Sequence, residues 1–140
     1  MIYIAGPFFN EKQVNFINQI EKALNKNRLE YFSPRSEGVL LSMSEEDKAK
    51  SKRDIYESNI GHIKDASLMV AVIDDRDVGT IWEMGYGTAL GIPIISISNH
   101  SYGLNVMLAE SVSAHVLSIE EMLVAIHDPD YKGQLIKGIY

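Results

Sequence analysis

The sequence predicts an α/β fold in which a parallel sheet is covered by helices on both faces. Short apolar runs of strand type alternate with stretches whose apolar residues recur at helical spacing, and this alternation is typical of parallel strands joined by helical crossovers. The chain has 140 residues, of which 46% are hydrophobic and 23% charged. That length and apolar content predict one domain, residues 1–140, with a core of its own.

The first half of the chain gives two strands and two helices. Residues 2–6 (IYIAG) form an apolar run that ends in glycine, and the stretch after Asn10 has its apolar residues at helical spacing. Residues 29–33 (LEYFS) are expected to form the second strand. A capping-box pattern that begins at Ser44 predicts a long helix to about Lys64.

The second half continues the alternation. Residues 67–74 (SLMVAVID) are a continuous apolar run typical of a buried strand, and a helix near 80–90 and a strand at 92–98 follow. The remaining segments are a helix at 104–112, a strand at 114–118, a helix at 119–127 and a tail at 128–140. Five strands in this arrangement match a flavodoxin-like, doubly wound sheet.

A doubly wound sheet also predicts where a ligand binds. Ligands of such sheets lie beyond the carboxyl ends of the strands, at the point where the strand order reverses. The loops expected to surround the cleft are residues 5–10, 33–43, 74–79 and 98–105.

Composition narrows the classes of partner. The net charge is −6 with a pI near 5.1, and no run of lysine or arginine is long enough to follow a phosphate backbone, so we expect no nucleic-acid partner. The absence of cysteine excludes disulfides and thiolate chemistry and fits a reducing compartment. The first residues lack the basic region of a signal peptide and no apolar run reaches ~20 residues, so we expect neither a signal peptide nor a membrane span. We therefore expect a cytoplasmic protein without membrane contact that acts on small molecules.

Glu83 is the residue that most needs an explanation. It stands in the glycine-flanked segment TIWEMGYG, between Trp82 and Met84, about one helical turn after Gly79. Its side chain can therefore point back toward the predicted cleft, where a partly desolvated carboxylate could act as nucleophile or base. The alternative is a glutamate early in a helix that interacts only with the helix dipole.

Other kinds of site find little support in the sequence. The glycines after residue 78 are accompanied by neither a Walker lysine nor the GxGxxG spacing. The histidines show no ligand-like spacing, so we expect no metal site, and the serines lack a nucleophile-elbow pattern. Carboxylate chemistry remains as the main possibility.

Four segments together carry a resemblance to a known family. They are IYIAGPFF, SPRSEG, DVGTIWEMGYGTALGIPII, and LNVML with a C-terminal tyrosine. Over nearly the whole chain the sequence resembles the nucleoside 2-deoxyribosyltransferases, and its motif D-x-G-T-x-x-E-x-G-Y is quite specific, although related nucleotide N-glycosidases share the G-x-x-x-E-x-G core. The resemblance implies an enzyme of nucleoside salvage that moves 2-deoxyribose between the nucleobases of 2′-deoxynucleosides through a covalent deoxyribosyl-glutamate, without metal or organic cofactor.

The resemblance also assigns catalytic roles. Glu83 matches the nucleophile that attacks C1′, Asp77 the acid that protonates the departing base, and Tyr3 the tyrosine whose hydroxyl holds the nucleophile in place. From the residues alone, Asp77 could equally cap the following helix and Tyr3 could be a packed strand aromatic.

Substrate contacts follow from the same comparison. Gly6 and Pro7 would shape the turn at one edge of the cleft, Phe9 would cover the base or the sugar, and Glu37 would contact the base edge. Gly79 is expected to contact the substrate at the other edge of the cleft. Packing in the core is the alternative for Phe9. Asn59 stands where several relatives carry a second base-contacting aspartate, and an amide can donate and accept, whereas an ionised carboxylate only accepts.

The last matched segment implies an assembly. Asn105 and Met107 match an N-x-M segment that reaches into a neighbouring subunit and binds the sugar 5′-hydroxyl, with Tyr140 nearby. This implies a homo-oligomer built from dimers, up to a hexamer, with shared sites. The alternative for the two residues is a helix cap and a core methionine.

Two other functions stay open at the level of sequence. One is a 2′-deoxynucleoside 5′-monophosphate N-glycosidase, in which water replaces the acceptor base. The other is a nucleoside-binding module of the same fold that has no catalytic activity.

Overall fold

Five parallel strands form one sheet at the centre of the protein. In the computed structural model, which describes residues 1–37, 44–101 and 103–135, their order is β2-β1-β3-β4-β5. The strands are β1 Ile2–Ala5, β2 Tyr31–Phe32, β3 Leu68–Val72, β4 Ile94–Ile97 and β5 Ala114–Val116. This confirms the flavodoxin-like sheet predicted from the alternation of elements.

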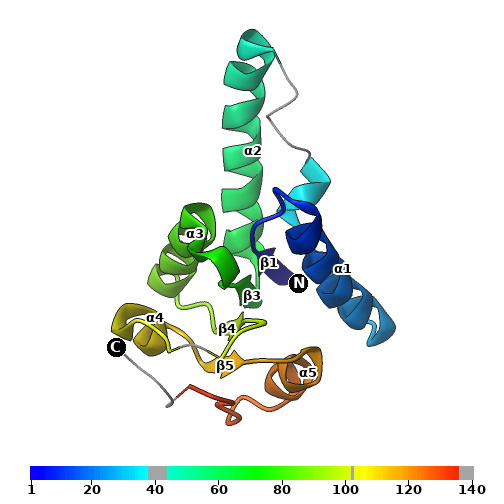
Figure 1. The fold of residues 1–140 in the computed structure, drawn as a ribbon. Helices are drawn as coiled ribbons and strands as arrows, with labels where there is room; N and C mark the ends of the chain where they lie inside the picture. The colour runs from blue at the N-terminus through cyan, green and yellow to red at the C-terminus, as the bar shows by residue number, and fades with distance from the viewer. Residues whose placement is uncertain (38–43, 102, 136–140) are drawn as a thin grey trace.

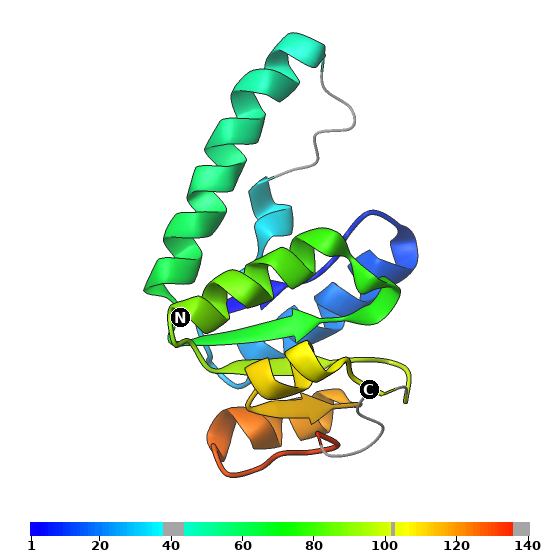
Figure 2. The ribbon, with the colours of Figure 1, turned by 90° about the vertical axis from the view of Figure 1, so that its left-hand side faces the viewer.

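Helices cover both faces of the sheet (Figures 1 and 2). The α-helices are α1 Glu11–Lys26, α2 Glu45–Asp65, α3 Val78–Ala89, α4 Val106–Ser111 and α5 Ile119–His127, and short 3₁₀-helices span Pro34–Glu37 and Asp74–Arg76. Apolar residues of α1 and α5 pack on one face, while α2, α3 and α4 contribute to the cluster on the other. Because both faces are covered, the strands are apolar on both sides and read as continuous apolar runs.

Helix α2 differs from the other helices in its surroundings. It rises well beyond the sheet (Figures 1 and 2), and Ile63, near its C-terminal end, is its one buried residue among those described. The cap predicted at its start is present: the Ser44 hydroxyl accepts a hydrogen bond from Asp47 N at 3.2 Å and donates to Asp47 Oδ2 at 2.9 Å. Among the described residues, α2 therefore buries little of its length against the sheet.

Two expectations about the edges of the sheet need correction. The second strand is only Tyr31–Phe32 instead of residues 29–33, because it lies at the sheet edge and pairs with β1 alone. The expected tail does not leave the fold directly after α5. His115 on β5 donates through its backbone N to Lys132 O and accepts from Gln134 N, so this segment pairs along the outer edge of β5.

Among the described residues, no helix is both long and apolar enough to cross a membrane.

Candidate active site

The central feature of the site is a hydrogen bond between β1 and α3. The Tyr3 hydroxyl donates to Glu83 Oε2 across 80 positions of sequence. Tyr3 is fully buried, with 0% of its surface exposed, and lies in the core beneath α3. On α3, Thr80, Met84 and Gly87 are buried. Glu83 is partly buried at the side of this helix and is held toward β1, at the point where the strand order reverses.

The environment of Glu83 changes its acidity. Burial raises its pKa to about 7, the Tyr3 hydrogen bond opposes this rise, and the negative charge of Asp77 adds to it. The pKa of Tyr3 is raised far above its usual range, first by burial and then by Glu83, so Tyr3 remains a hydrogen-bond donor. A carboxylate that is poorly solvated yet ionisable near neutral pH can act as nucleophile or base.

Asp77 lies at the start of the same helix. Its Oδ2 accepts hydrogen bonds from Thr80 N at 2.9 Å and from Thr80 Oγ1 at 2.8 Å. Both bonds use one oxygen, so Oδ1 takes no part in the cap. The capping role considered for Asp77 is thus present, and it is compatible with a second role for the same side chain.

Aromatic rings form the wall of the site beside Tyr3. The Phe32 ring at the end of β2 stacks on Tyr3 with 5.8 Å between the centroids, and the His62 ring from α2 stacks on Phe32 at 3.5 Å. His62 is fixed by its Nδ1, which lies 2.7 Å from Ser58 O. Sequence reasoning missed both Phe32 and His62, because an aromatic residue at a strand end and a single helical histidine carry no spacing signal.

Asn59, one helical turn before Ile63 on α2, has a polar atom without a partner. Its Oδ1 is buried, and none of the described residues donates a hydrogen bond to it. Leaving a buried acceptor unpaired costs about 1–3 kcal/mol, so a ligand that donates to this oxygen would recover that free energy. The sequence predicts a substrate contact at Asn59, and this unpaired oxygen is a suitable acceptor.

Known proteins resemble this chain in both sequence and fold. The family model described as nucleoside 2-deoxyribosyltransferase matches residues 2–117. The chain belongs to this family. A solved 2-deoxyribosyltransferase from Bacillus psychrosaccharolyticus is similar at a TM-score of 0.78 and 30% identity, over 86% of this chain and 88% of that one.

More distant similarities extend the comparison. The chain is 30% identical over 100 residues to the uncharacterized protein UU063 of Ureaplasma parvum, a match that covers 64% of this chain and 60% of that protein. A conserved protein from Enterococcus faecalis V583 has a TM-score of 0.56 at 19% identity, covering 99% of this chain and 87% of that one. The Clostridium botulinum CMP N-glycosidase BcmB has a TM-score of 0.52 at 20% identity, covering 90% of this chain and 97% of that one. The last two share the fold.

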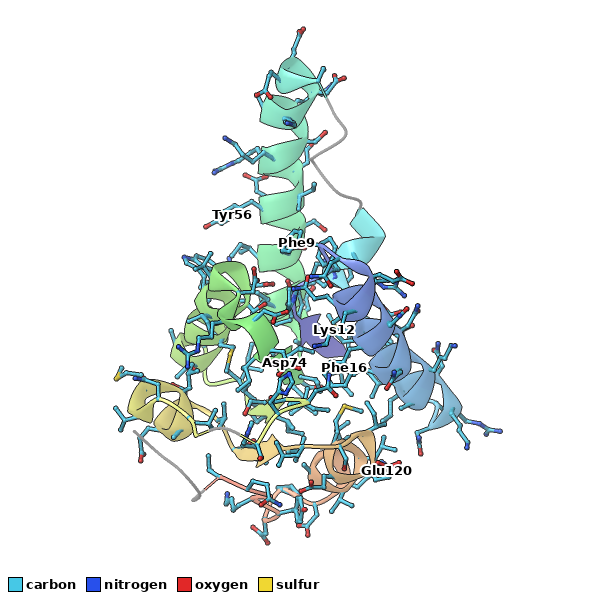
Figure 3. The ribbon with its side chains drawn as sticks, viewed as in Figure 1. Phe9, Lys12, Phe16, Tyr56, Asp74 and Glu120 are labelled. Atoms are coloured by element: carbon cyan, nitrogen blue, oxygen red, sulfur yellow. The ribbon has the colours of Figure 1, made fainter. Side chains whose placement is uncertain are left out.

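The loop after β1 is another part of the candidate site. A side chain at Gly6 would place its Cβ 2.9 Å from Ile17 Cδ1 and 3.1 Å from Val72 Cβ, so only glycine lets this loop lie against α1 and β3. Phe9 is 59% exposed and stacks on Phe8 at 5.2 Å, so the alternative of core packing is wrong for Phe9. Its ring is available to cover a ligand (Figure 3).

The residues matched to the family's intersubunit segment lie apart from the Tyr3–Glu83 pair. Asn105 caps α4 by accepting from Met107 N at 2.9 Å, and no hydrogen bond among the described residues joins it to Glu83. Met107 is 73% exposed, so the alternative of a core methionine is wrong. Both line a crevice of about 260 Å³ between α3 and α4.

The structure describes less of three other expected substrate contacts, Gly79, Glu37 and Tyr140. Gly79 is exposed in the first turn of α3, and a Cβ there would lie 3.3 Å from Asp77 Oδ2. The Glu37 backbone ends a 3₁₀-helix, but its side chain and Tyr140 lie outside the described residues.

No three metal-ligating side chains cluster within residues 1–37, 44–101 and 103–135.

Proposed function

We propose that this protein transfers 2-deoxyribose between nucleobases of 2′-deoxynucleosides in cytoplasmic nucleoside salvage, with Glu83 as the nucleophile. The observation that carries the proposal is the partly buried Tyr3–Glu83 hydrogen bond, in which the pKa of the carboxyl is raised to about 7. Membership of the deoxyribosyltransferase family supports the choice of substrate.

The reaction proceeds in two displacements. A carboxylate oxygen of Glu83 attacks C1′, the bond from C1′ to the base nitrogen breaks, and its electron pair leaves with the base. Asp77 gives a proton to that base. A nitrogen of the second base then attacks C1′, the ester bond to Glu83 breaks, and the incoming base returns a proton to Asp77. Two inversions at C1′ restore the β-anomer, as in retaining glycosidases.

Substrate recognition is divided among the loops and α2. Phe9 covers the base, and Asn59 bonds to the base edge through its unpaired Oδ1. Glu37 adds a contact from the loop after β2, and the backbone at Gly6 and Gly79 shapes the cleft. No metal or organic cofactor takes part.

The proposal includes a homo-oligomer with shared sites. Apart from Glu83, helix α3 has no charged residue, and its Val78 and Trp82 are 84% and 49% exposed. Val106 and Met107 on α4 are exposed as well. Contiguous exposed apolar residues mark interaction surfaces, and a second copy of the chain would cover them. Asn105 would then close the sugar site of the neighbouring subunit, together with Tyr140.

A second candidate is hydrolysis of deoxynucleoside 5′-monophosphates, with water as acceptor. One observation favours it: Arg76 lines the same crevice as Asn105, and an arginine there suits a 5′-phosphate better than a 5′-hydroxyl. The two candidates differ in substrate and in the need for an acceptor base.

The deciding experiment incubates thymidine or deoxyinosine with adenine or cytosine, with and without acceptor, and separates the products by chromatography. Deoxynucleoside 5′-monophosphates are tested in parallel. The transferase should form the new nucleoside only with acceptor and leave monophosphates intact. Without acceptor, a deoxyribosyl adduct should accumulate on the peptide containing Glu83. Glu83→Gln should abolish it, whereas Glu46→Gln, at an exposed carboxylate on α2, should not.

Mixing two inactive variants tests the shared site. In a dimer, a hybrid of Glu83→Ala and Asn105→Ala subunits has one site with both residues intact and one with neither. Random exchange should therefore restore roughly a quarter of the wild-type sites. A mixture that stays inactive despite proven exchange would show that Asn105 does not complete a neighbour's site.

A further inference from the structure

Gln13 on α1 joins the loops that follow β1 and β3. Its Oε1 accepts a hydrogen bond from Phe9 N at 2.8 Å, and its Nε2 donates to Asp75 Oδ2 at 2.8 Å. One side-chain amide thus bridges the loop that carries Phe9 and the loop that leads into Asp77. The sequence places Asp75 in a loop expected at the cleft, but it predicts no role in the site for Gln13.

The topology explains why such a bridge matters here. Strands β1 and β3 are neighbours, but the helices that follow them, α1 and α3, lie on opposite faces of the sheet (Figure 1). The two loops therefore diverge at the carboxyl edge, which opens a cleft between them. Phe9 and Asp74, labelled in Figure 3, mark these two loops.

The side-chain amide of Gln13 supplies both groups that this position requires. Phe9 N is a donor and an ionised Asp75 carboxylate is an acceptor, so the bridging side chain must accept on one side and donate on the other. Gln13 is the third residue after the cap Asn10, and its backbone N donates to Asn10 Oδ1 at 2.9 Å. A capping box would direct the Gln13 side chain to Asn10 N, so this motif accounts for neither the bond to Phe9 N nor the bond to Asp75.

The backbone next to Asp75 is unusual. Asp75 and Arg76 have φ values of 65° and 51°, a left-handed conformation that residues other than glycine rarely adopt, here in two consecutive positions. Asp77 comes directly after them. Asp74, which precedes them, is buried and accepts from Ser98 Oγ at 2.5 Å and Asn99 N at 3.0 Å. The two left-handed residues, Asp75 and Arg76, thus follow a buried Asp74, and the Asp75 side chain is held by Gln13.

We propose that Gln13 is a positioning residue that sets the separation between Phe9 and Asp77, so that a base covered by Phe9 lies within reach of the proton on Asp77. This role rests on the proposed transferase function. Replacing Gln13 should therefore slow the reaction of substrates whose base must be enclosed and protonated, and should have little effect on the attack by Glu83 itself.

The test reverses the direction of one hydrogen bond. Gln13→Glu keeps an acceptor for Phe9 N and a residue favoured in capping boxes, but it sets two carboxylates against each other at Asp75. Asp75→Asn alone keeps an acceptor for Gln13 Nε2. In the double variant, the amide introduced at position 75 would donate to the carboxylate introduced at position 13 and restore the bridge. Gln19→Glu, exposed on the same helix, controls for the added charge.

The expected result is a specific and reversible loss. Gln13→Glu should lower kcat/KM for deoxyinosine at least tenfold, but at most about threefold for a p-nitrophenyl deoxyriboside, whose leaving group needs no proton. Asp75→Asn, the double variant and Gln19→Glu should stay within about threefold of wild type on both substrates. The thermal midpoints of all variants should agree within a few degrees, because the bridge is exposed.

Two outcomes would overturn the role of Gln13 while leaving the transferase function intact. One is a Gln13→Glu variant as active as wild type, and the other is a double variant as impaired as Gln13→Glu. Equal losses on both substrates would also contradict it, because they would indicate a general distortion. A wild-type protein that consumes no deoxynucleoside would instead overturn the proposed function, and the role of Gln13 with it.

Discussion

Replacing Glu83 by glutamine should make the protein more stable at high pH. The pKa of Glu83 is raised from 4.5 to about 7, so the folded protein binds this proton more tightly than the unfolded chain does. The contribution to stability is therefore fully present below a pH of about 4.5 and is lost as the pH rises through about 7. A difference of one in pKa corresponds to about 1.4 kcal/mol, which gives a total loss of about 3 kcal/mol.

The measurement compares urea unfolding of wild type and Glu83→Gln at about pH 5 and about pH 9. The advantage of the variant should grow by about 2.5 kcal/mol between these values, because part of the transition already lies below pH 5. Glu120→Gln, which changes an exposed carboxylate on α5 (Figure 3), should show no such growth. If the two variants respond to pH alike, Glu83 is not the desolvated carboxyl described above.

Three other substitutions test the parts of the site. Tyr3→Phe removes the hydrogen bond that lowers the pKa of Glu83, so the acid limb of kcat/KM against pH should move above its wild-type midpoint, and an unchanged midpoint would contradict this. Asp77→Asn should slow deoxyinosine at least a hundredfold more than a p-nitrophenyl deoxyriboside, measured by initial rates; equal losses would limit Asp77 to the helix cap. Asn59→Asp should raise the preference for guanine over hypoxanthine as acceptor at least fivefold, because guanine presents two adjacent donors to a carboxylate; competition between the two bases measures it.

Much of the fold follows from local sequence signals. The apolar runs at β3 and β4 and the caps at Asn10, Ser44 and Asp77 are short-range features, and all appear where the pattern predicts them. The pairing of residues 132–134 with β5 could not be predicted. It depends on backbone hydrogen bonds at a sheet edge, which leave no mark in side-chain periodicity.

The site is predictable only in part, for a related reason. The family resemblance identifies Glu83 and pairs it with the Tyr3 hydroxyl, and the structure has a hydrogen bond between the two. From the residues alone, Tyr3 looks like an ordinary packed strand aromatic. The bridge through Gln13 joins residues 62 positions apart, and the left-handed backbone at Asp75 involves no glycine that would reveal it. Contacts of this kind depend on the tertiary arrangement of loops, so they appear only when the strand order is known.

The proposed function gives Asp77 a chemical role beside its structural one, and helix α3 accounts for the structural role. The helix contains Gly79, Gly85 and Gly87, and each interior glycine costs up to about 1 kcal/mol relative to alanine. A Cβ at Gly87 would lie 3.0 Å from Met69 Cε, so a larger residue there would require the end of the Met69 side chain to shift. The double hydrogen bond from Thr80 to Asp77 offsets part of this cost at the end nearest the cleft. Asparagine caps helices as well as aspartate does but cannot carry the proton, so Asp77→Asn separates the two roles, whereas alanine would remove both.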